Sequence, residues 1–146
     1  MISHLTFLKH SMFALVLASP ILVSGSAAIS AEMKALKSGV FLGVDGNHKG
    51  SGKVELIHTN ADKTLLKLSG FDVTPGPDLK VILVKASNIK SSEDVTKSEF
   101  VSLGALQAPT GDQSYELPVG LDGSKYGSAA IWCETYSFLF ASAPLN

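Results

Sequence analysis

The sequence predicts an all-β protein, a single-domain antiparallel β-sandwich of about seven or eight strands. Three observations favour this fold class. Short apolar or alternating segments recur along the chain, glycine, proline, asparagine and aspartate separate them, and no amphipathic helix of useful length appears. The 146 residues, of which 45% are hydrophobic, suit one domain with its own core.

The first 31 residues are predicted to be a cleaved export signal. Lys9 and His10 precede an apolar run from Met12 to Val23, and small residues up to Ala31 suit a signal peptidase. The run is too short for a bilayer, which needs about 20 apolar residues. We therefore expect a periplasmic or extracellular protein with no membrane span after cleavage; an uncleaved anchor is the alternative. Residues 32–38 would be a leader, helical or loose, and residues 39–146 the domain.

The first half of the domain shows strand patterns separated by turns. The predicted strands cover residues 39–44, 53–59 and 63–69. Val54, Leu56 and His58 hold alternate positions, which is typical of a half-buried strand. A glycine-rich turn is expected at residues 45–52, where we expect His48 to be exposed.

The second half continues the pattern. Gly76-Pro77-Asp78 predicts a rigid turn in which glycine permits positive φ, and the apolar residues 79–85 predict a strand covered on both sides. Residues 86–99 form a polar connection with room for a helical turn. Further strands are expected at residues 100–106, 113–117 and 129–140, followed by a tail at 141–146.

The segment 129–140 holds the only cysteine and the only tryptophan. As one strand it would place Trp132, Phe138 and Phe140 on a core face, because alternate side chains share a face. Cys133 would then lie on the opposite face, near the surface or lining a shallow pocket. A bulge or tight turn near Glu134 would reset this alternation and bury the thiol.

Charge and cysteine content limit the partners. The formal net charge is −1 and arginine is absent, so nucleic acid is not expected as a partner. A lone cysteine in an exported chain has no internal mate. It is an inert buried thiol, half of a disulfide-linked dimer, or a reactive group, and Glu134 beside it does not favour a thiolate.

Metal and hydrolytic sites are poorly supported. A blue-copper centre needs two histidines and a cysteine, usually with an axial methionine, but no nitrogen or thioether ligand follows Cys133. No metal site is predicted, although a two-ligand site of His48 and Cys133 stays open. Covalent c-type haem lacks its C-x-x-C-H motif, and no serine has a nucleophile-elbow context.

A series of motifs runs through the chain in one order. They are Phe41, His48 with Ser51-Gly52, Leu66-x-Leu68-x-x-Phe71, Gly76-Pro77-Asp78-Leu79-x-Val81, Leu103-Gly104-x-Leu106, Gly111-x-Gln113-x-Tyr115-x-Leu117-Pro118, Ile131-Trp132-Cys133 and Phe138-x-Phe140-x-x-Ala143-x-Leu145. In these motifs, over residues 39–146, the chain resembles the electron-transfer DM-thirteen domain. This is a small exported β domain, found alone in bacteria and beside DOMON-type domains in animal proteins.

The resemblance implies that Cys133 matches the signature cysteine of the family and works in redox chemistry, as a bare thiol or with a bound haem. His48 and Asp78 are then candidate cofactor-binding residues at the rim of the site. The partner would be a redox protein or a small ligand of unknown identity, and whether the chain is an enzyme stays open. The alternative is an extracytoplasmic ligand- or protein-binding domain in which Cys133 is structural.

Overall fold

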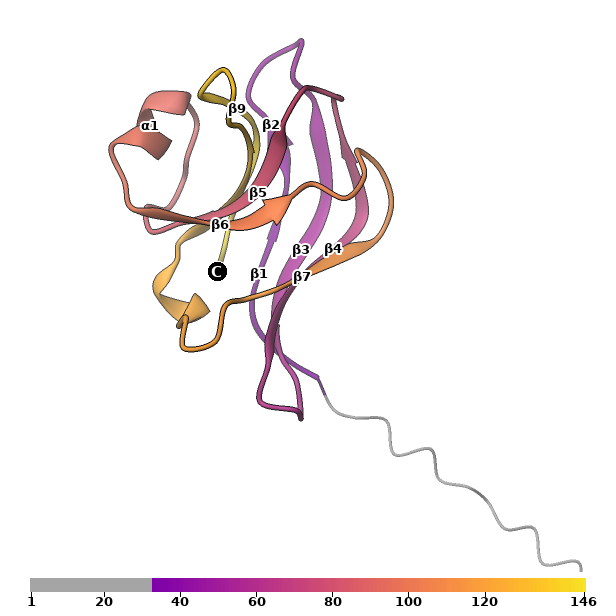
Figure 1. Ribbon diagram of the computed structural model, residues 1–146. Coiled ribbons are helices and arrows are strands. Elements are labelled where there is room, and N and C mark those ends of the chain that lie inside the picture. The colour runs from indigo at the N-terminus through magenta and orange to yellow at the C-terminus, as the bar shows by residue number, and fades with distance from the viewer. Residues whose placement is uncertain (1–32) are drawn as a thin grey trace, which may run out of the picture.

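The computed structural model describes residues 33–146, and the predicted export signal at residues 1–31 lies outside them. Two antiparallel sheets pack face to face in the described part of the chain (Figure 1). The predicted β-sandwich is therefore confirmed, with nine strands in place of seven or eight.

The first sheet has the strand order β1-β3-β4-β7. Its strands are β1 (Lys34–Val40), β3 (Gly50–His58), β4 (Thr64–Val73) and β7 (Gln113–Glu116). Val54 and Leu56 face the core and lie opposite Leu68 and Leu66 in the neighbouring strand. This burial follows the predicted alternation of β3 from Lys53 to Leu56 and departs from it at the end of the strand, where Ile57 is buried and His58 is exposed.

The second sheet has the strand order β2-β9-β8-β5-β6. Its strands are β2 (Leu42–Gly43), β5 (Leu79–Val84), β6 (Phe100–Ala105), β8 (Ser128–Cys133) and β9 (Phe138–Pro144). Val81 and Leu83 of β5 join the core between the sheets, whereas Ile82 and Val84 join a second cluster on the outer face. The prediction that this strand is covered on both sides is confirmed.

A short helix, α1 (Ser92–Thr96), covers the outer face of the second sheet (Figure 1). Its capping box joins Ser91 and Asp94, and its Val95 side chain packs into the outer cluster with Trp132. The predicted helical turn in residues 86–99 is therefore present. No helix in the described residues is long and apolar enough to cross a bilayer.

Both ends of the domain differ from the sequence prediction. Residues 34–40 form strand β1 instead of a helix or loose leader, because they pair with β3 in an antiparallel ladder. Residues 141–144 belong to β9 instead of a tail, since they pair with β8 and bury Ala141 and Ala143. Ladder hydrogen bonds and core contacts outweigh the weak local pattern of both segments.

Candidate functional site

The hairpin of β8 and β9 carries the cysteine. A turn over residues 134–137 interrupts the predicted single strand, and the register of the two strands then skips Phe140. The turn and this bulge reset the alternation, so Trp132 and Leu139 face α1 while Cys133 and Phe140 face the other sheet. The expectation of a near-surface Cys133 is wrong, because its side chain is 0% exposed.

The thiol is buried directly beneath an exposed turn. Cys133 Sγ donates a hydrogen bond to the Pro77 carbonyl oxygen, with a sulfur–oxygen distance of 3.1 Å. Residues 75–78 are all exposed, as are residues 134–137 of the hairpin turn. The sulfur of this core residue thus contacts the backbone of a turn whose residues are exposed.

Asp78 ties these two turns together. Its Oδ1 pairs with Lys80 Nζ at 2.9 Å and its Oδ2 accepts a hydrogen bond from Thr135 Oγ1 at 3.2 Å. Its backbone carbonyl accepts a hydrogen bond from the Glu134 amide at 3.2 Å. The Lys80 hydrogen bond, with help from Thr135, lowers the pKa of the Asp78 carboxyl. We call Asp78, Lys80, Glu134 and Thr135 the latch.

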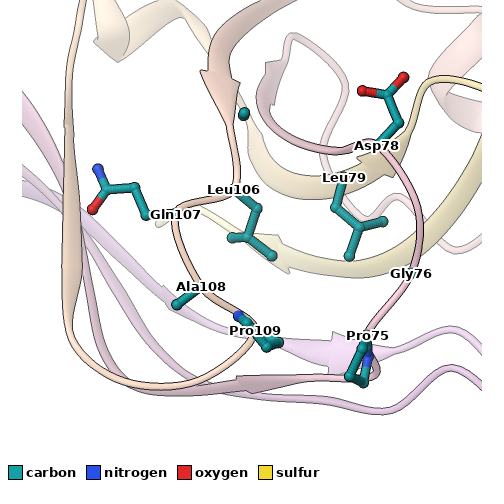
Figure 2. A pocket seen from close by; sticks show the side chains of 9 residues that line it. Pro75, Gly76, Asp78, Leu79, Leu106, Gln107, Ala108 and Pro109 are labelled. Atoms are coloured by element: carbon teal, nitrogen blue, oxygen red, sulfur yellow. The ribbon is translucent and has the colours of Figure 1, made fainter.

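Gly76 differs from its predicted role in this turn. The positive φ falls on Asp78, at 50°, which an aspartate tolerates better than most residues. Gly76 is needed for space instead, because a Cβ there would lie 2.5 Å from the Phe140 ring. Figure 2 shows the other side of the turn, where a hollow of about 270 Å³ separates it from residues 105–109 and the Asp78 carboxylate points away.

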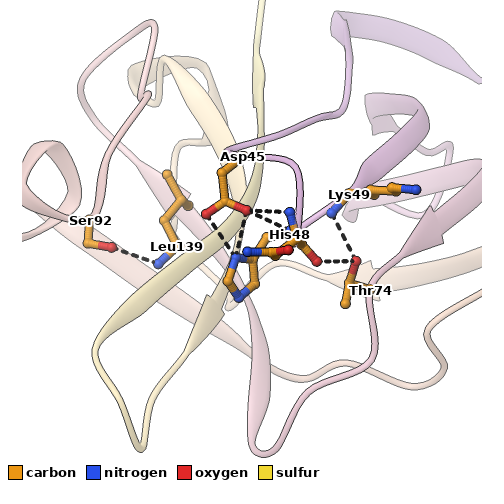
Figure 3. Close-up of polar contacts among 7 residues, drawn as sticks. Asp45, His48, Lys49, Thr74, Ser92 and Leu139 are labelled. Carbon is orange, nitrogen blue, oxygen red and sulfur yellow. Dashed lines mark hydrogen bonds and ion pairs between the residues drawn. The ribbon is translucent and has the colours of Figure 1, made fainter.

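His48 is held by an aspartate three residues earlier. Its Nδ1 lies 3.0 Å from both carboxylate oxygens of Asp45, whose Oδ1 also accepts hydrogen bonds from the backbone amides of Asn47 and His48 (Figure 3). The hydrogen bonds from His48 lower the pKa of the Asp45 carboxyl. Since the carboxylate can only accept, the proton of the neutral ring belongs on Nδ1.

An apolar hollow of about 330 Å³ opens beside this histidine. We call it the aromatic pocket; its walls are His48, Pro77, Tyr136, Phe138 and Phe140. The His48 ring centre lies 4.7 Å from that of Phe138 and 4.5 Å from that of Phe140. Pro77 therefore belongs to both features, as a wall of the aromatic pocket and as the acceptor for the Cys133 thiol.

A comparison with protein families matches residues 41–145 to Electron transfer DM13. The chain belongs to this family. The match confirms the resemblance seen in the sequence and gives the chain a general role in electron transfer or redox chemistry. No curated protein and no solved structure matched the chain.

The DM13 domain brings the three predicted site residues to one end of the sandwich. His48 lines the aromatic pocket together with Pro77, and Asp78 of the latch follows Pro77 in the chain. The Pro77 carbonyl accepts the hydrogen bond from Cys133. In the described residues, the hydrogen bond of the sulfur goes to Pro77 and not to His48 or Asp78. No group of three or more histidine, cysteine or acidic residues is placed to hold a metal ion within residues 33–146.

The sequence interpretation missed two residues of this site. Asp45 precedes His48 by three residues in a turn, a spacing that could have identified the pair. The sequence around Pro77 does not indicate that its carbonyl contacts Cys133, because the two residues lie 56 positions apart. His48 also proved half-buried, with 26% of its side chain exposed, although a glycine-rich turn predicts exposure.

Proposed function

We propose that this DM13 domain is an exported redox module in which Cys133 is the redox-active residue and the turn at residues 75–78 gates access to it. The observation that carries the proposal is the contact between Cys133 Sγ and the Pro77 carbonyl, 3.1 Å long and directly beneath the surface. Movement of that one turn would open a path to the sulfur.

The proposed reaction is thiol–disulfide exchange with a disulfide of a partner protein, a chemistry that suits an oxidising compartment. The Cys133 sulfur forms a bond with one partner sulfur, and the partner's S–S bond breaks. The proton of the Cys133 thiol leaves with the released partner sulfur, which becomes a thiol. Cys133 is oxidised to the mixed disulfide and the released sulfur is reduced, so atoms and electrons balance.

The latch supplies the gate. The ion pair of Asp78 with Lys80 has side-chain exposures of 37% and 25%, and exposed pairs of this kind are weak. One hollow adjoins the turn at Pro75, Gly76 and Asp78, and another adjoins it at Pro77. A partner that contacts the aromatic pocket would touch Pro77 and could displace the turn from the sulfur.

Haem does not fit Cys133 in this conformation. The side chain is 0% exposed and its sulfur already faces the Pro77 carbonyl, so no open position for an iron atom remains at the sulfur. His48 is the better fit for a metal-bound group, because a carboxylate on Nδ1 is the usual partner of a ligating histidine. We therefore place the redox chemistry on the thiol itself.

Export is part of the proposal and rests on the sequence. The basic start, the short apolar run and the small residues before Ala31 together form a cleavable signal. Sequencing the N-terminus of the protein recovered from the periplasm or medium tests this directly. A start close to residue 32 is expected, and a cytoplasmic protein that retains residue 1 would contradict export.

The gate is tested by the rate at which a small aromatic disulfide, 5,5′-dithiobis(2-nitrobenzoate), labels the native protein in low urea. The chain has one cysteine, so all labelling reports Cys133, and Cys133→Ser is the blank. Local opening gives a rate that hardly changes with urea, whereas global unfolding gives a rate that rises with the full denaturant dependence of stability. Labelling through global unfolding alone would overturn the redox proposal.

The second candidate is a ligand- or protein-binding domain with a structural cysteine. The complete burial of Cys133 and its satisfied thiol hydrogen bond favour this alternative. It predicts that Cys133→Ala keeps partner binding intact and that labelling requires unfolding. The urea experiment therefore separates the two candidates in one measurement.

A further inference from the structure

The contact between Cys133 and the turn at residues 75–78 leaves no room for a further atom on the sulfur. The cysteine side chain is fully buried, and its Sγ lies 3.1 Å from the Pro77 carbonyl oxygen. The same turn rests on the Phe140 ring, since even a Cβ on Gly76 would lie 2.5 Å from that ring. A thiol hydrogen fits between the sulfur and the carbonyl, whereas a larger group bonded to the sulfur requires a neighbour to move.

The proposed exchange puts such a group on the sulfur. Cys133 Sγ loses its proton and gains a bond to one partner sulfur, and the other partner sulfur leaves as a thiol. Cys133 then has no hydrogen to donate to Pro77. The sequence holds no second cysteine, so the mixed disulfide lasts until a thiol of another molecule attacks the partner sulfur. That attack forms a disulfide between the attacking sulfur and the partner sulfur, and the proton of the attacking thiol passes to Cys133.

The latch is the weakest barrier around the sulfur. It joins the turn at residues 75–78 to the hairpin turn at residues 134–137, because Asp78 accepts hydrogen bonds from Thr135 Oγ1 and from the Glu134 amide, each 3.2 Å long. These three residues are exposed, whereas Leu79, which lies opposite Cys133 in the neighbouring strand, is buried in the same core cluster. Displacing close-packed core residues costs more than breaking exposed polar contacts, so the latch yields first.

We propose that the Cys133 sulfur is the trigger of a redox switch, in which the free thiol keeps the latch closed and a substituent on the sulfur opens it. Whichever of the two turns moves, the contacts of Asp78 with the hairpin turn break. The aromatic pocket changes as well, because its walls Pro77 and Tyr136 belong to the two turns. This inference rests on the proposed function for its trigger, the exchange at Cys133.

The switch presents a different surface to each reaction partner. The protein that brings the disulfide meets a closed latch and a complete aromatic pocket. The thiol that later releases Cys133 meets an open latch and a pocket that lacks one wall. A molecule that binds only one of these surfaces therefore favours one state of the sulfur, because the coupling between binding and the switch is reciprocal.

The test uses a methylthio group as the smallest disulfide substituent. Methyl methanethiosulfonate is added to the unaltered protein in urea, where the thiol forms a Cys133–S–S–CH₃ bond and releases methanesulfinate, and the urea is then removed. Amide hydrogen exchange is followed by NMR. We expect the Glu134 amide to exchange at least about tenfold faster in the adduct than in the thiol form, because its hydrogen bond to the Asp78 carbonyl is lost.

The controls lie in the same molecule. The Leu117 amide donates to the Thr64 carbonyl at 2.9 Å at the other end of the sandwich, and its exchange should not change. A reductant should remove the methylthio group and restore slow exchange of the Glu134 amide. The same treatment of Cys133→Ser, which has no thiol, should alter neither amide.

Equal exchange of the Glu134 amide in the adduct and the thiol form would overturn the proposal, because the core would then hold the substituent with the latch closed. Equal acceleration of the Glu134 and Leu117 amides would also overturn it, since the whole domain would have responded. The adduct forms in urea, so the test does not require the native gate to open. Labelling of Cys133 through global unfolding alone would therefore refute the redox function and leave this comparison intact.

Discussion

His48 and His58 are two histidines that each lie beside an aspartate in a turn, at opposite ends of β3 and roughly 30 Å apart along it. At the first end Nδ1 of His48 contacts both oxygens of Asp45 at 3.0 Å, and two phenylalanine rings flank the imidazole. At the second end Nε2 of His58 lies 3.5 Å from Asp62, whose side chain is 99% exposed.

The difference shows what turns a common residue pair into a candidate site. The His58 pair is solvated and free to rearrange, so it adds little to stability or chemistry. The His48 pair is fixed on one side by backbone amides that bind Asp45, and on the other by packed rings. Both ends hold a histidine beside an aspartate. The surroundings of each pair determine whether the imidazole ring is held in a fixed direction.

The largest expected effect comes from removing a ring at the His48 end. Phe140→Ala should lower the free energy of unfolding by about 3 kcal/mol, because this 7% exposed side chain packs in the core. Val119→Ala at the His58 end should change it by less than about 0.5 kcal/mol, since Val119 is fully exposed. Urea unfolding followed by Trp132 fluorescence measures both, and similar losses would show that the two ends are equally packed.

The second effect concerns the aspartates with positive φ at the two ends. Asp78 and Asp62 have φ values of 50° and 57°, and asparagine tolerates this conformation as well. Asp78→Asn weakens the latch and should speed disulfide labelling of Cys133 about threefold, because local opening becomes easier. Asp62→Asn should leave the rate unchanged. Equal rates for all three proteins would remove Asp78 from the gate.

The third effect is a change of tautomer at one histidine only. In its neutral form, the His48 ring should carry its proton on Nδ1, from which Asp45 accepts the hydrogen bond. Asp45→Ala should move it partly to Nε2, which most neutral histidines prefer in the absence of a partner, whereas Asp62→Ala should not alter His58. The ¹⁵N chemical shifts of both rings report these populations. An Nε2 proton on the neutral His48 ring of the unaltered protein would refute the assignment of the proton to Nδ1.

Local sequence pattern predicted much of the fold. Four consecutive apolar residues at 81–84 correctly indicated a strand buried on both faces, because no polar position was left for solvent. The alternation of β3 was equally readable. Strand β1 could not be predicted in this way, since apolar residues show no clear period from Lys34 to Val40. The segment is a strand because it pairs with β3.

The site was only partly predictable, because a turn or bulge changes which side chains of a strand share a face. Which residues of β9 share the face of Cys133 depends on one turn at residues 134–137 and one bulge at Phe140, and each reverses the alternation that follows it. A turn near Glu134 was the predicted alternative that would bury the thiol, but a continuous strand was expected. The Pro77 contact depends on the pairing of β5 with β8, which no local pattern specifies.

The smallest expected effect is a pH dependence at the His48 end. The pKa of Asp45 is lowered from its ordinary value of 3.8, chiefly by the hydrogen bond from His48. A lowered pKa in the folded state means that the charged carboxylate stabilises the fold above pH 3.8, and that this contribution is lost as the pH falls through the lower folded value. Stability should therefore fall more steeply on acidification below about pH 4 in the unaltered protein than in Asp45→Asn.

His48→Phe removes the main cause of the lowered Asp45 pKa and should flatten the dependence of stability on pH in the same way, with no further change in the double variant. Urea unfolding across this pH range measures the slopes, and parallel slopes for all four proteins would mean that the carboxylate gains nothing from its histidine.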